Sequence, residues 1–556
     1  MRILRAICAL LALLFIGCNE PGPVAIPDSA IPSLGTPNDN EIWFTTNDNN
    51  NLNGIDESAF NATITDIEYS EFGVNIIRFD APLTTIGAGA FDARGTSRNL
   101  NNISLPNTVT AIGERAFYEC SSLECITLGP NIKSCGSQAF DNCQSLYSIH
   151  ISSIADWAQT EFANETANPL NYGGSLILNG KKIKELVLPA WVSHIGSYAF
   201  CNYNTISSVT IPASVKSIGK EAFSGCNGLS KVNIEDVAAW CKIEFATALS
   251  NPLSIAGTLL VNGVSLTTLS LEGVDSISPR AFQGCNNIAS LRSDSSLRSI
   301  GEEAFRGSLS LSSVELGEGV TTIEGKAFMG CTALKSITIP DSVTAIGAYA
   351  FGYSRNLTSV TIGKGVASIG DAAFCDCSNL KAFYGKFASA DNCYLVVNGV
   401  LHSFAIGCGA TEFTVPDSVS EIGNSAFYNC SSLTSVTIGS SVPAIEAAAF
   451  EYCSSLKTIT IPDSVTTIGE SAIKKCNSLT SAIIGKGVTA IGSSAFYECS
   501  NLTEVYCKPT IPPTGGYNMF NNNAADRKIY VPAESLDDYK DHDDWSRYAD
   551  SIEALN

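Results

Sequence analysis

One short block of residues recurs down most of this 556-residue chain, and it constrains the fold more than any other feature. The block from Ala426 to Phe450 reads AFYNCSSLTSVTIGSSVPAIEAAAF, and most copies of its phenylalanine lie 23 residues apart. A fixed period of this length is typical of a solenoid, in which no unit buries its own apolar face and each unit stacks on the next. The landmark positions are Phe91, Phe117, Phe140, Phe200, Phe223, Phe282, Phe305, Phe328, Phe351, Phe374, Phe427, Phe450, Ile473 in place of Phe, and Phe496.

Each repeat contains a short stretch in which apolar and polar residues alternate. In the copy that follows Phe427, the pattern L-x-x-V-x-I runs from Leu433 to Ile438, and Gly439 comes after it. Alternation of this kind predicts a β-strand with its apolar side inward, and a glycine or proline after the strand turns the chain away. We therefore expect a β-rich leucine-rich repeat solenoid with 23-residue coils and with this strand on the concave face.

Three longer intervals interrupt the period, and both ends of the chain lack it. The first two intervals are related, because Trp157 and Asn179-Gly180 recur as Trp240 and Asn262-Gly263, and each Asn-Gly predicts a hairpin turn. We expect each tryptophan to anchor its insertion to the core; the alternative is an exposed platform for a sugar ring. The acidic stretch from Ala533 to Leu555 predicts a closing helix. The expected divisions are a signal peptide (1–17), a flexible tether (18–40), an N-terminal cap (41–80), a solenoid (81–506) with enlarged coils near 149–188, 234–271 and 383–413, and a C-terminal cap (507–556).

The N-terminus has the features of an export signal. Arg2 and Arg5 precede an apolar run from Ala6 to Ile16, which is too short to span a membrane with margin. The sequence Phe15-Ile16-Gly17-Cys18 resembles the lipobox of bacterial lipoproteins, although Phe15 replaces the usual leucine. This resemblance implies cleavage before Cys18 and acylation of that cysteine. The alternative is a plain secreted protein that is cut at a nearby site.

The cysteines follow the repeat. The chain has 20 of them, and ten lie three residues after the landmark Phe or its Ile substitute. A residue at constant phase in a solenoid forms a column, and cysteine behaves as a small hydrophobe in a core. We predict a buried thiol ladder; the alternative is that some pairs are oxidised, as is common in exported proteins. The ten are Cys120, Cys143, Cys226, Cys285, Cys331, Cys377, Cys430, Cys453, Cys476 and Cys499.

Charge and motifs argue against several classes of function. The formal net charge of −21 would repel a phosphate backbone, so we expect no nucleic-acid partner. No Gly-x-Ser-x-Gly elbow, phosphate-binding Gly-Lys-Ser/Thr loop or His-Glu-x-x-His helix occurs, and the four histidines are scattered. The loop from Asn47 to Gly54 lacks the bidentate glutamate of a calcium site, because Phe60 occupies that position. We expect no enzyme activity, no catalytic residues, no cofactor and no metal.

The repeat resembles a known family. The phases L-T-S-V-T-I-P-D-S-V-T-x-I-G-x-x-A-F-x-x-C are similar to the BspA-type leucine-rich repeat of bacterial surface proteins, over roughly residues 79–506. The Trp-bearing insertions and the Tyr530-Val531-Pro532 ending are similar to variants in lipoproteins of anaerobic gut and oral bacteria. The resemblance implies a lipid-tethered surface protein, placed on the outer membrane of a Gram-negative bacterium, that adheres to host proteins, glycans or other microbes.

The outward strand positions form the candidate binding face. They lie eight and ten residues after each landmark, and stacking at about 4.7 to 4.9 Å turns them into two hydroxyl columns. Such a face suits sugar hydroxyls or an ordered water layer; the plain alternative is that serine and threonine only keep the strands soluble. The column residues are Ser208, Thr210, Ser336, Thr338, Ser359, Thr361, Ser435, Thr437, Thr458 and Thr460. Larger side chains, expected as contact points, interrupt the columns at His150, Lys231, Arg292, Glu315, Glu504 and Tyr506.

These observations favour a surface-exposed binding or adhesion module for a protein or glycan macromolecule, attached to the membrane by a lipid anchor only. The second hypothesis is a passive surface-coat protein without a specific ligand.

Overall fold

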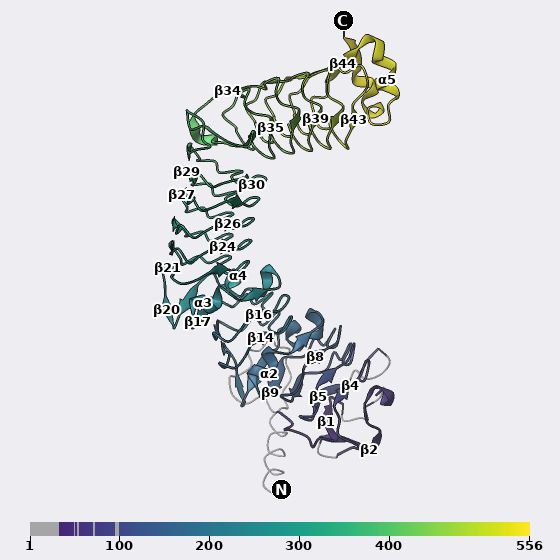
Figure 1. Ribbon diagram of the computed structural model, residues 1–556. Coiled ribbons are helices and arrows are strands. Elements are labelled where there is room, and N and C mark those ends of the chain that lie inside the picture. Colours follow the sequence, from purple (N-terminus) through teal and green to yellow (C-terminus); the bar gives the residue numbers. More distant parts are fainter. Residues whose placement is uncertain (1–32, 49–50, 53–54, 71–72, 95–98, 556) are drawn as a thin grey trace, which may run out of the picture.

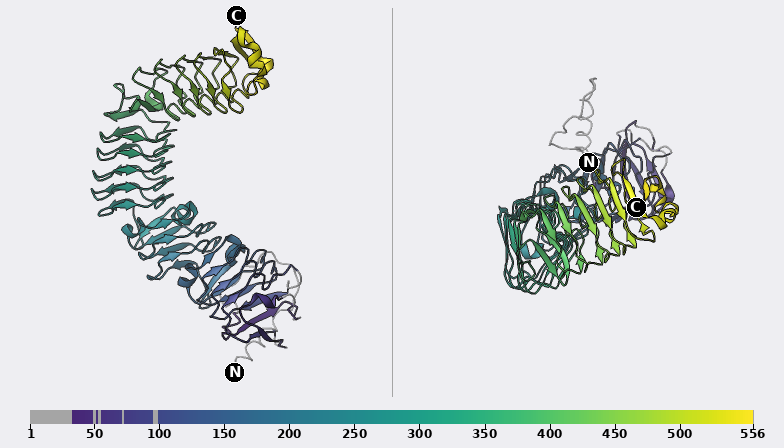
Figure 2. Two further views of the ribbon diagram at one scale, coloured as in Figure 1. Left: turned by 45° about the vertical axis from the view of Figure 1, so that its right-hand side comes forward. Right: turned by 90° about the horizontal axis from the view of Figure 1, so that it is seen from above.

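The protein forms a curved stack of flattened coils. The computed structural model describes residues 33–48, 51–52, 55–70, 73–94 and 99–555. Within them the coils follow one another along an arc, and the two ends of the arc face the same side (Figures 1 and 2). Each regular coil contributes one strand of three to five residues on one side and a two-residue strand on the other, and most strands pair in parallel with their equivalent in the next coil. The architecture is therefore a parallel β-solenoid.

The longer strands build the outer side of the arc, and the two-residue strands build the inner side, as both views show (Figures 1 and 2). The expectation that the longer strands line the concave face was wrong. The outer strands are β5 (Leu100–Ser104), β7 (Cys125–Leu128), β9 (Ser148–Ile151), β11 (Ser175–Leu178), β13 (Glu185–Val187), β15 (Ser208–Ile211), β17 (Lys231–Ile234), β19 (Leu259–Val261), β21 (Thr268–Leu271), β23 (Ser290–Ser293), β25 (Ser313–Glu315), β27 (Ser336–Thr338), β29 (Ser359–Ile362), β31 (Ala382–Gly385), β34 (Glu412–Thr414), β36 (Ser435–Thr437), β38 (Thr458–Ile461), β40 (Ser481–Ile484), β42 (Glu504–Cys507) and β44 (Lys528–Pro532). The inner strands are β4 (Thr85–Ile86), β6 (Ala111–Ile112), β8 (Ser134–Cys135), β10 (Glu161–Phe162), β14 (His194–Ile195), β16 (Ser217–Ile218), β18 (Glu244–Phe245), β22 (Ser276–Ile277), β24 (Ser299–Ile300), β26 (Thr322–Ile323), β28 (Ala345–Ile346), β30 (Ser368–Ile369), β35 (Glu421–Ile422), β37 (Ala444–Ile445), β39 (Thr467–Ile468), β41 (Ala490–Ile491) and β43 (Thr514–Gly515).

Neighbouring coils approach closely at glycines on both sides of the arc. A glycine follows most inner strands, and a methyl group added there would collide with the preceding coil. At Gly347 the added carbon would lie 2.3 Å from the Gly325 nitrogen, and at Gly363, which follows the outer strand β29, it would lie 2.2 Å from the Pro340 oxygen. Only glycine allows the backbone to approach so closely.

A column of stacked phenylalanines occupies the core. Between Phe282 and Phe374, successive ring centroids lie 5.1 to 5.4 Å apart, with interplanar angles of 2 to 8°. The column also contains Phe520, which stacks on Phe496 at 5.1 Å and continues the solenoid one coil beyond the expected end at residue 506. Each ring is fully or almost fully buried, so apolar burial along this column is the main stabilising term of the stack.

The thiol ladder is confirmed. All ten cysteines at the repeat phase are fully buried, and every cysteine of the described residues is a free thiol. Most ladder thiols donate to the carbonyl of the landmark residue one coil earlier; Cys453 Sγ, for example, lies 3.2 Å from the Phe427 oxygen. Ser308 and Ser354 occupy the same phase and make the same bond at 3.0 Å. The column therefore supplies weak hydrogen-bond donors as well as packing.

The turn around each landmark contains two left-handed residues that the sequence did not reveal. They lie two residues before and two after the phenylalanine, as in Lys326 (φ 57°) and Gly330 (φ 71°) around Phe328. Many of these positions hold large side chains, including Tyr349 (φ 55°) and Tyr353 (φ 61°). A non-glycine residue in this conformation is strained. The hydrogen bonds to the next coil hold it there, as from the Tyr353 nitrogen to the Cys375 oxygen at 2.8 Å.

Both ends of the stack are covered. At the N-terminus, β1 (Glu41–Thr46) pairs antiparallel with β5 and with β3 (Asn75–Phe79), and β2 (Ile64–Glu68) pairs with β3. A 3₁₀ turn, η1 (Glu57–Ala59), lies beside them. At the C-terminus, η6 (Ala533–Ser535), α5 (Leu536–Asp541) and η7 (Ser546–Ser551) precede β45 (Ile552–Leu555). The expected closing helix is therefore only partly helical, because its last residues form a strand parallel to β44. These elements remove exposed sheet edges.

Part of the expected tether lies on the sheet. The Ser33 hydroxyl is 3.1 Å from the Thr127 hydroxyl, and the Ser104 hydroxyl donates to the Gly35 carbonyl. Residues 33–40 therefore cross the outer face of the first coils, and the prediction of a free tether was wrong for this segment. The signal peptide and the rest of the tether lie outside the described residues.

Three joints interrupt the regular coils, and we name them by position: the first joint (residues 149–188), the second joint (residues 234–271) and the third joint (residues 383–413). The first contains α2 (Ile154–Ala158), η2 (Glu165–Ala167), η3 (Pro169–Tyr172) and β12 (Lys181–Lys182). The second contains α3 (Val237–Trp240), η4 (Ala248–Ser250), α4 (Leu253–Ala256) and β20 (Val264–Ser265). The third contains the antiparallel pair β32 (Tyr394–Val397) and β33 (Val400–Phe404), and then η5 (Ile406–Cys408).

Candidate functional site

The structure brings the predicted hydroxyl residues together in register on the outer face. Ser336 pairs with Ser359 and Thr338 with Thr361, while Ser435 pairs with Thr458 and Thr437 with Thr460. All of them are exposed or half-buried, because the alternate residues of each strand point into the core. Ser208 and Thr210 lie in a separate sheet beside Lys231 and Asn233. The columns therefore form several segments along the arc.

Arg292 and Glu315 interrupt the columns as a matched pair. They occupy the same phase in neighbouring strands, and the Arg292 Nε lies 3.0 Å from a Glu315 carboxylate oxygen. Both side chains are more than half exposed, so solvent screens the attraction and the pair adds little stability. The pair instead places a planar donor group and a carboxylate on an otherwise small-residue surface.

The C-terminal end of the outer face carries an aromatic cluster. The Tyr506 and Tyr530 rings stack with centroids 5.1 Å apart and an interplanar angle of 22°. The Tyr506 hydroxyl donates to Glu504 at 3.0 Å, and this hydrogen bond raises the pKa of Tyr506. Lys528 pairs in register with Glu504 and contacts Glu553 at 2.5 Å. We name these five residues the tyrosine platform.

Tyr384 is a second exposed aromatic group that the sequence analysis missed. It follows Thr338 and Thr361 in the same column, and its side chain is 46% exposed. Its position could have been predicted, because Tyr384 lies ten residues after Phe374 and other outward-pointing residues lie at the same distance from their landmarks. It lies at the start of the third joint, in the last strand of the sheet that β27, β29 and β31 form.

One expected contact residue lies inside the structure. His150 is only 7% exposed, and its Nε2 lies 3.1 Å from the hydroxyl of Ser148, which is fully buried. Burial lowers the pKa of His150, because desolvation disfavours the charged ring. The expectation that His150 faces a partner was wrong, whereas Lys231 is exposed as expected.

The two joint tryptophans anchor their insertions, as expected, and neither is a sugar platform. Trp157 is 5% exposed and Trp240 is 1% exposed. The Trp157 indole N–H donates to the Ala199 carbonyl at 2.9 Å, and the Trp240 indole donates to Ala281 at 2.8 Å. Both alanines directly precede a landmark phenylalanine. In regular coils the carbonyl at this position accepts a hydrogen bond from the backbone N–H of the landmark one coil earlier. Each indole therefore replaces a backbone donor that the insertion removes.

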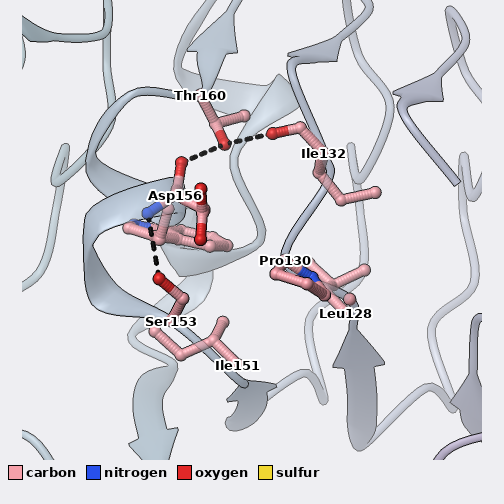
Figure 3. Close-up of a pocket in the computed structure, with 9 residues that line it drawn as sticks. Leu128, Pro130, Ile132, Ile151, Ser153, Asp156 and Thr160 are labelled. Carbon is pink, nitrogen blue, oxygen red and sulfur yellow. Dashed lines mark hydrogen bonds between the residues drawn. The ribbon is translucent and has the colours of Figure 1, made fainter. Parts of the chain in front are cut away.

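A small hollow lies where the first joint meets the coil before it (Figure 3). The Ser153 hydroxyl caps α2 by accepting from the Asp156 N–H at 3.3 Å, and the Thr160 hydroxyl donates to the Ile132 carbonyl at 2.9 Å. Trp157 forms part of the wall. Its volume of about 10 Å³ holds one water molecule at most. The hollow is therefore a small packing defect between the joint and the coil, and not a ligand site.

Other kinds of site find no support in the part of the chain that the structure describes. No group of three or more His, Cys, Asp or Glu side chains is arranged to hold a metal ion there. No helix among the same residues is both long and apolar enough to cross a membrane. The outer face, with its columns, the Arg292–Glu315 pair and the tyrosine platform, is therefore the candidate site.

Comparison with solved structures finds several similar proteins. The chain is similar to a leucine-rich cell surface protein of Faecalibacterium prausnitzii, with 27% identity, 63% of this chain and 87% of that chain covered, and a TM-score of 0.46. It is also similar to the pneumococcal vaccine antigen PcpA, with 19% identity, 67% and 88% of the two chains covered, and a TM-score of 0.40. A leucine-rich repeat protein of Bacteroides ovatus covers 89% of this chain and 91% of its own, with 21% identity and a TM-score of 0.28.

No curated protein matches the chain. The sequence profile described as "BspA type Leucine rich repeat region (6 copies)" matches residues 62–176, 174–246, 254–381 and 402–525. These ranges cover most of the chain and include the first joint, most of the second joint and most of the regular coils. The chain belongs to the BspA-type leucine-rich repeat family.

Proposed function

We propose that the protein is a cell-surface adhesion module that binds a protein or glycan through the outer face of its solenoid, and that it has no enzyme activity. The observation that carries the proposal is the register of this face, where hydroxyl side chains align over successive coils and lead, through Ile483, to the half-buried stack of Tyr506 and Tyr530. Aromatic and arginine side chains contribute most to binding at protein interfaces. Leucine-rich repeat solenoids use their extended surfaces as binding scaffolds.

We propose in addition that the protein is exported and acylated at Cys18, which would hold it at the surface of the outer membrane of a Gram-negative bacterium. The similarity to a described cell surface protein supports surface display. Replacing Cys18 with serine should abolish metabolic labelling with a fatty acid. Persistent labelling of the Cys18→Ser variant would contradict acylation at this position.

A glycan and extracellular-matrix array probed with the mature protein tests the binding proposal. We expect a ligand whose affinity falls at least tenfold in a Tyr506→Ala variant, because removal of a hot-spot aromatic side chain costs about 2 kcal/mol or more. Tyr517→Ala is the matched control, since Tyr517 is 70% exposed but belongs to a turn outside the strands. Equal losses in both variants would contradict binding through the tyrosine platform, and no binding on any array would favour the passive coat.

The shape of the face separates glycan or protein binding from ordering of water as ice. An ice plane is flat, whereas the outer face is convex along the whole arc (Figure 2). A flat crystal plane would contact only a few coils at once. The geometry therefore favours a partner that is small or flexible on the scale of the arc.

A further inference from the structure

The third joint contains the two least buried cysteines of the described chain. Cys393 precedes β32 and Cys408 ends η5; both are half-buried, whereas the other sixteen cysteines are buried. Neither lies at the ladder phase three residues after a landmark. Cys408 packs against both apolar cores, which meet in this joint.

The backbone brings these two cysteines together. Tyr394 lies opposite Phe404 in the β32–β33 hairpin, and the next residue pair is joined by a hydrogen bond from the Ala405 nitrogen to the Cys393 oxygen at 2.7 Å. The chain then enters η5, where the Cys408 nitrogen donates to the Ala405 oxygen at 3.0 Å. Residues three apart in a 3₁₀ turn eclipse one another, so the Cys408 side chain lies on the Ala405 side of the hairpin. There it interacts directly with Cys393.

The thiol ladder provides an internal contrast. Neighbouring ladder thiols also contact one another, as Cys476 contacts Cys453 and Cys499. The difference is burial, because all ten ladder cysteines are fully buried whereas Cys393 and Cys408 are half-buried. Full burial excludes oxidants. The ladder is therefore protected where the joint pair is not.

We propose that Cys393 and Cys408 form a disulfide that closes the hairpin of the third joint. The oxidant is a small-molecule disulfide such as oxidised glutathione, met after the export proposed above. One cysteine loses its proton and attacks a sulfur of the oxidant, which gives a mixed disulfide and one reduced small thiol. The second cysteine loses its proton and attacks the protein sulfur of that mixed disulfide. The protein gains one S–S bond, and the oxidant leaves as two thiols.

The environment of the pair sets the pH dependence of this exchange. Burial, followed by the contact with Cys408, raises the pKa of Cys393 to about 12. Asp391, whose backbone oxygen accepts from the Cys393 thiol at 3.6 Å, acts in the same direction. The attacking species is the thiolate, so we expect the rate of cross-linking to rise as the pH rises from 7 to 9.

Mass spectrometry of the full chain tests the proposal. The reduced, folded protein is incubated with oxidised glutathione, alkylated with iodoacetamide without denaturant, and digested without reduction. We expect one cross-linked peptide pair, Cys393 with Cys408, and ladder cysteines that react with iodoacetamide only after denaturation. Mixed glutathione adducts that persist on both residues, or a folded protein with both residues still alkylated as free thiols, would overturn the proposal.

Two variants sharpen this test. Cys393→Ser should leave Cys408 as a stable glutathione adduct, because no second thiol is present to displace the glutathione. Cys430→Ser is the matched control from the ladder, and it should form the cross-link to the same extent as the unchanged protein. Loss of the cross-link in a folded Cys430→Ser protein would also count against a specific pair. The cross-link is detected by mass spectrometry and does not depend on a bound ligand. A failure to find a ligand on the arrays would therefore not affect this test.

Discussion

The first two joints and the third joint connect the regular coils on either side of them through different contacts. In the first two, a fully or nearly buried tryptophan and an asparagine donate to the turn carbonyls of the next coil; Asn251, for example, donates to Arg280 and Ala281 at 2.6 and 3.2 Å. The outer sheet is interrupted at all three joints, because β11 does not pair with β13, β19 does not pair with β21 and β31 does not pair with β34. The apolar core is continuous through the tryptophan joints, but it divides into two clusters at the third.

Polar contacts accompany the apolar packing at the third joint. The Asp376 carboxylate, 5% exposed overall, accepts from Asn429 at 2.8 Å and pairs with Arg355 at 2.7 Å. The Asn398 amide donates to the Ala367 carbonyl at 2.9 Å. Polar contacts exchanged against water stabilise less than burial of a large ring. We infer that the third joint is the weaker connection, and that opening of the solenoid begins there.

The largest expected effect comes from removing a joint tryptophan. Trp240→Ala should destabilise the second joint by about 3 to 5 kcal/mol, because it leaves a cavity in the core and removes the donor to Ala281. Hydrogen exchange should then become faster in the coils around Phe282. Trp191→Ala is the control, since Trp191 is 61% exposed. Protection unchanged in Trp240→Ala would show that the indole is not what joins these coils.

A smaller effect is expected at the third joint. Asn429→Ala should destabilise it by about 1 to 3 kcal/mol, since the buried Asp376 carboxylate loses one of its two partners. Hydrogen exchange on both sides of the joint measures this change. Asn379→Ala, at an exposed site in the neighbouring turn, should change stability by less than about 0.5 kcal/mol. If Asn429→Ala proves as costly as Trp240→Ala, the contrast between the joints fails.

The smallest effect concerns pH. Burial lowers the pKa of His402, and the nearby Asp371 carboxylate opposes this shift. A histidine whose folded pKa is lowered contributes stability above its unfolded pKa of about 6.5 and loses it as the pH falls toward the folded value. We expect protection at the third joint to weaken from pH 7 to pH 5, and His402→Asn to remove this dependence. An unchanged pH profile in His402→Asn would assign the effect to other groups.

The sequence predicted the features that depend on constant phase. The phenylalanine column, the thiol ladder and the outward serine and threonine residues follow directly from the 23-residue period, because stacking in register is the only way to bury these apolar faces. Phe404 was missed although it lies 23 residues before Phe427 and its backbone nitrogen donates to Ala426 as in a landmark residue, because Ser403 and Gly407 replace the usual alanine and cysteine around it. Phe520 was missed because it lies 24 residues after Phe496. The predicted direction of curvature was wrong because the apolar pattern determines which side chains point into the core, but not which side of the coil lies on the inside of the arc. The burial of His150 likewise depends on contacts that the repeat does not encode.

The aligned columns of the outer face have a consequence for any partner that binds them. Where neighbouring coils carry the same side chains, as from Ser435 to Thr460, a partner can shift along the arc by one strand spacing and recover equivalent contacts. The partner can then bind at several overlapping positions on the outer face, and a partner released from one position is readily bound again at the next. Arg292, Tyr384 and Tyr506 end such runs, so they would act as the fixed points that determine where along the protein a partner comes to rest.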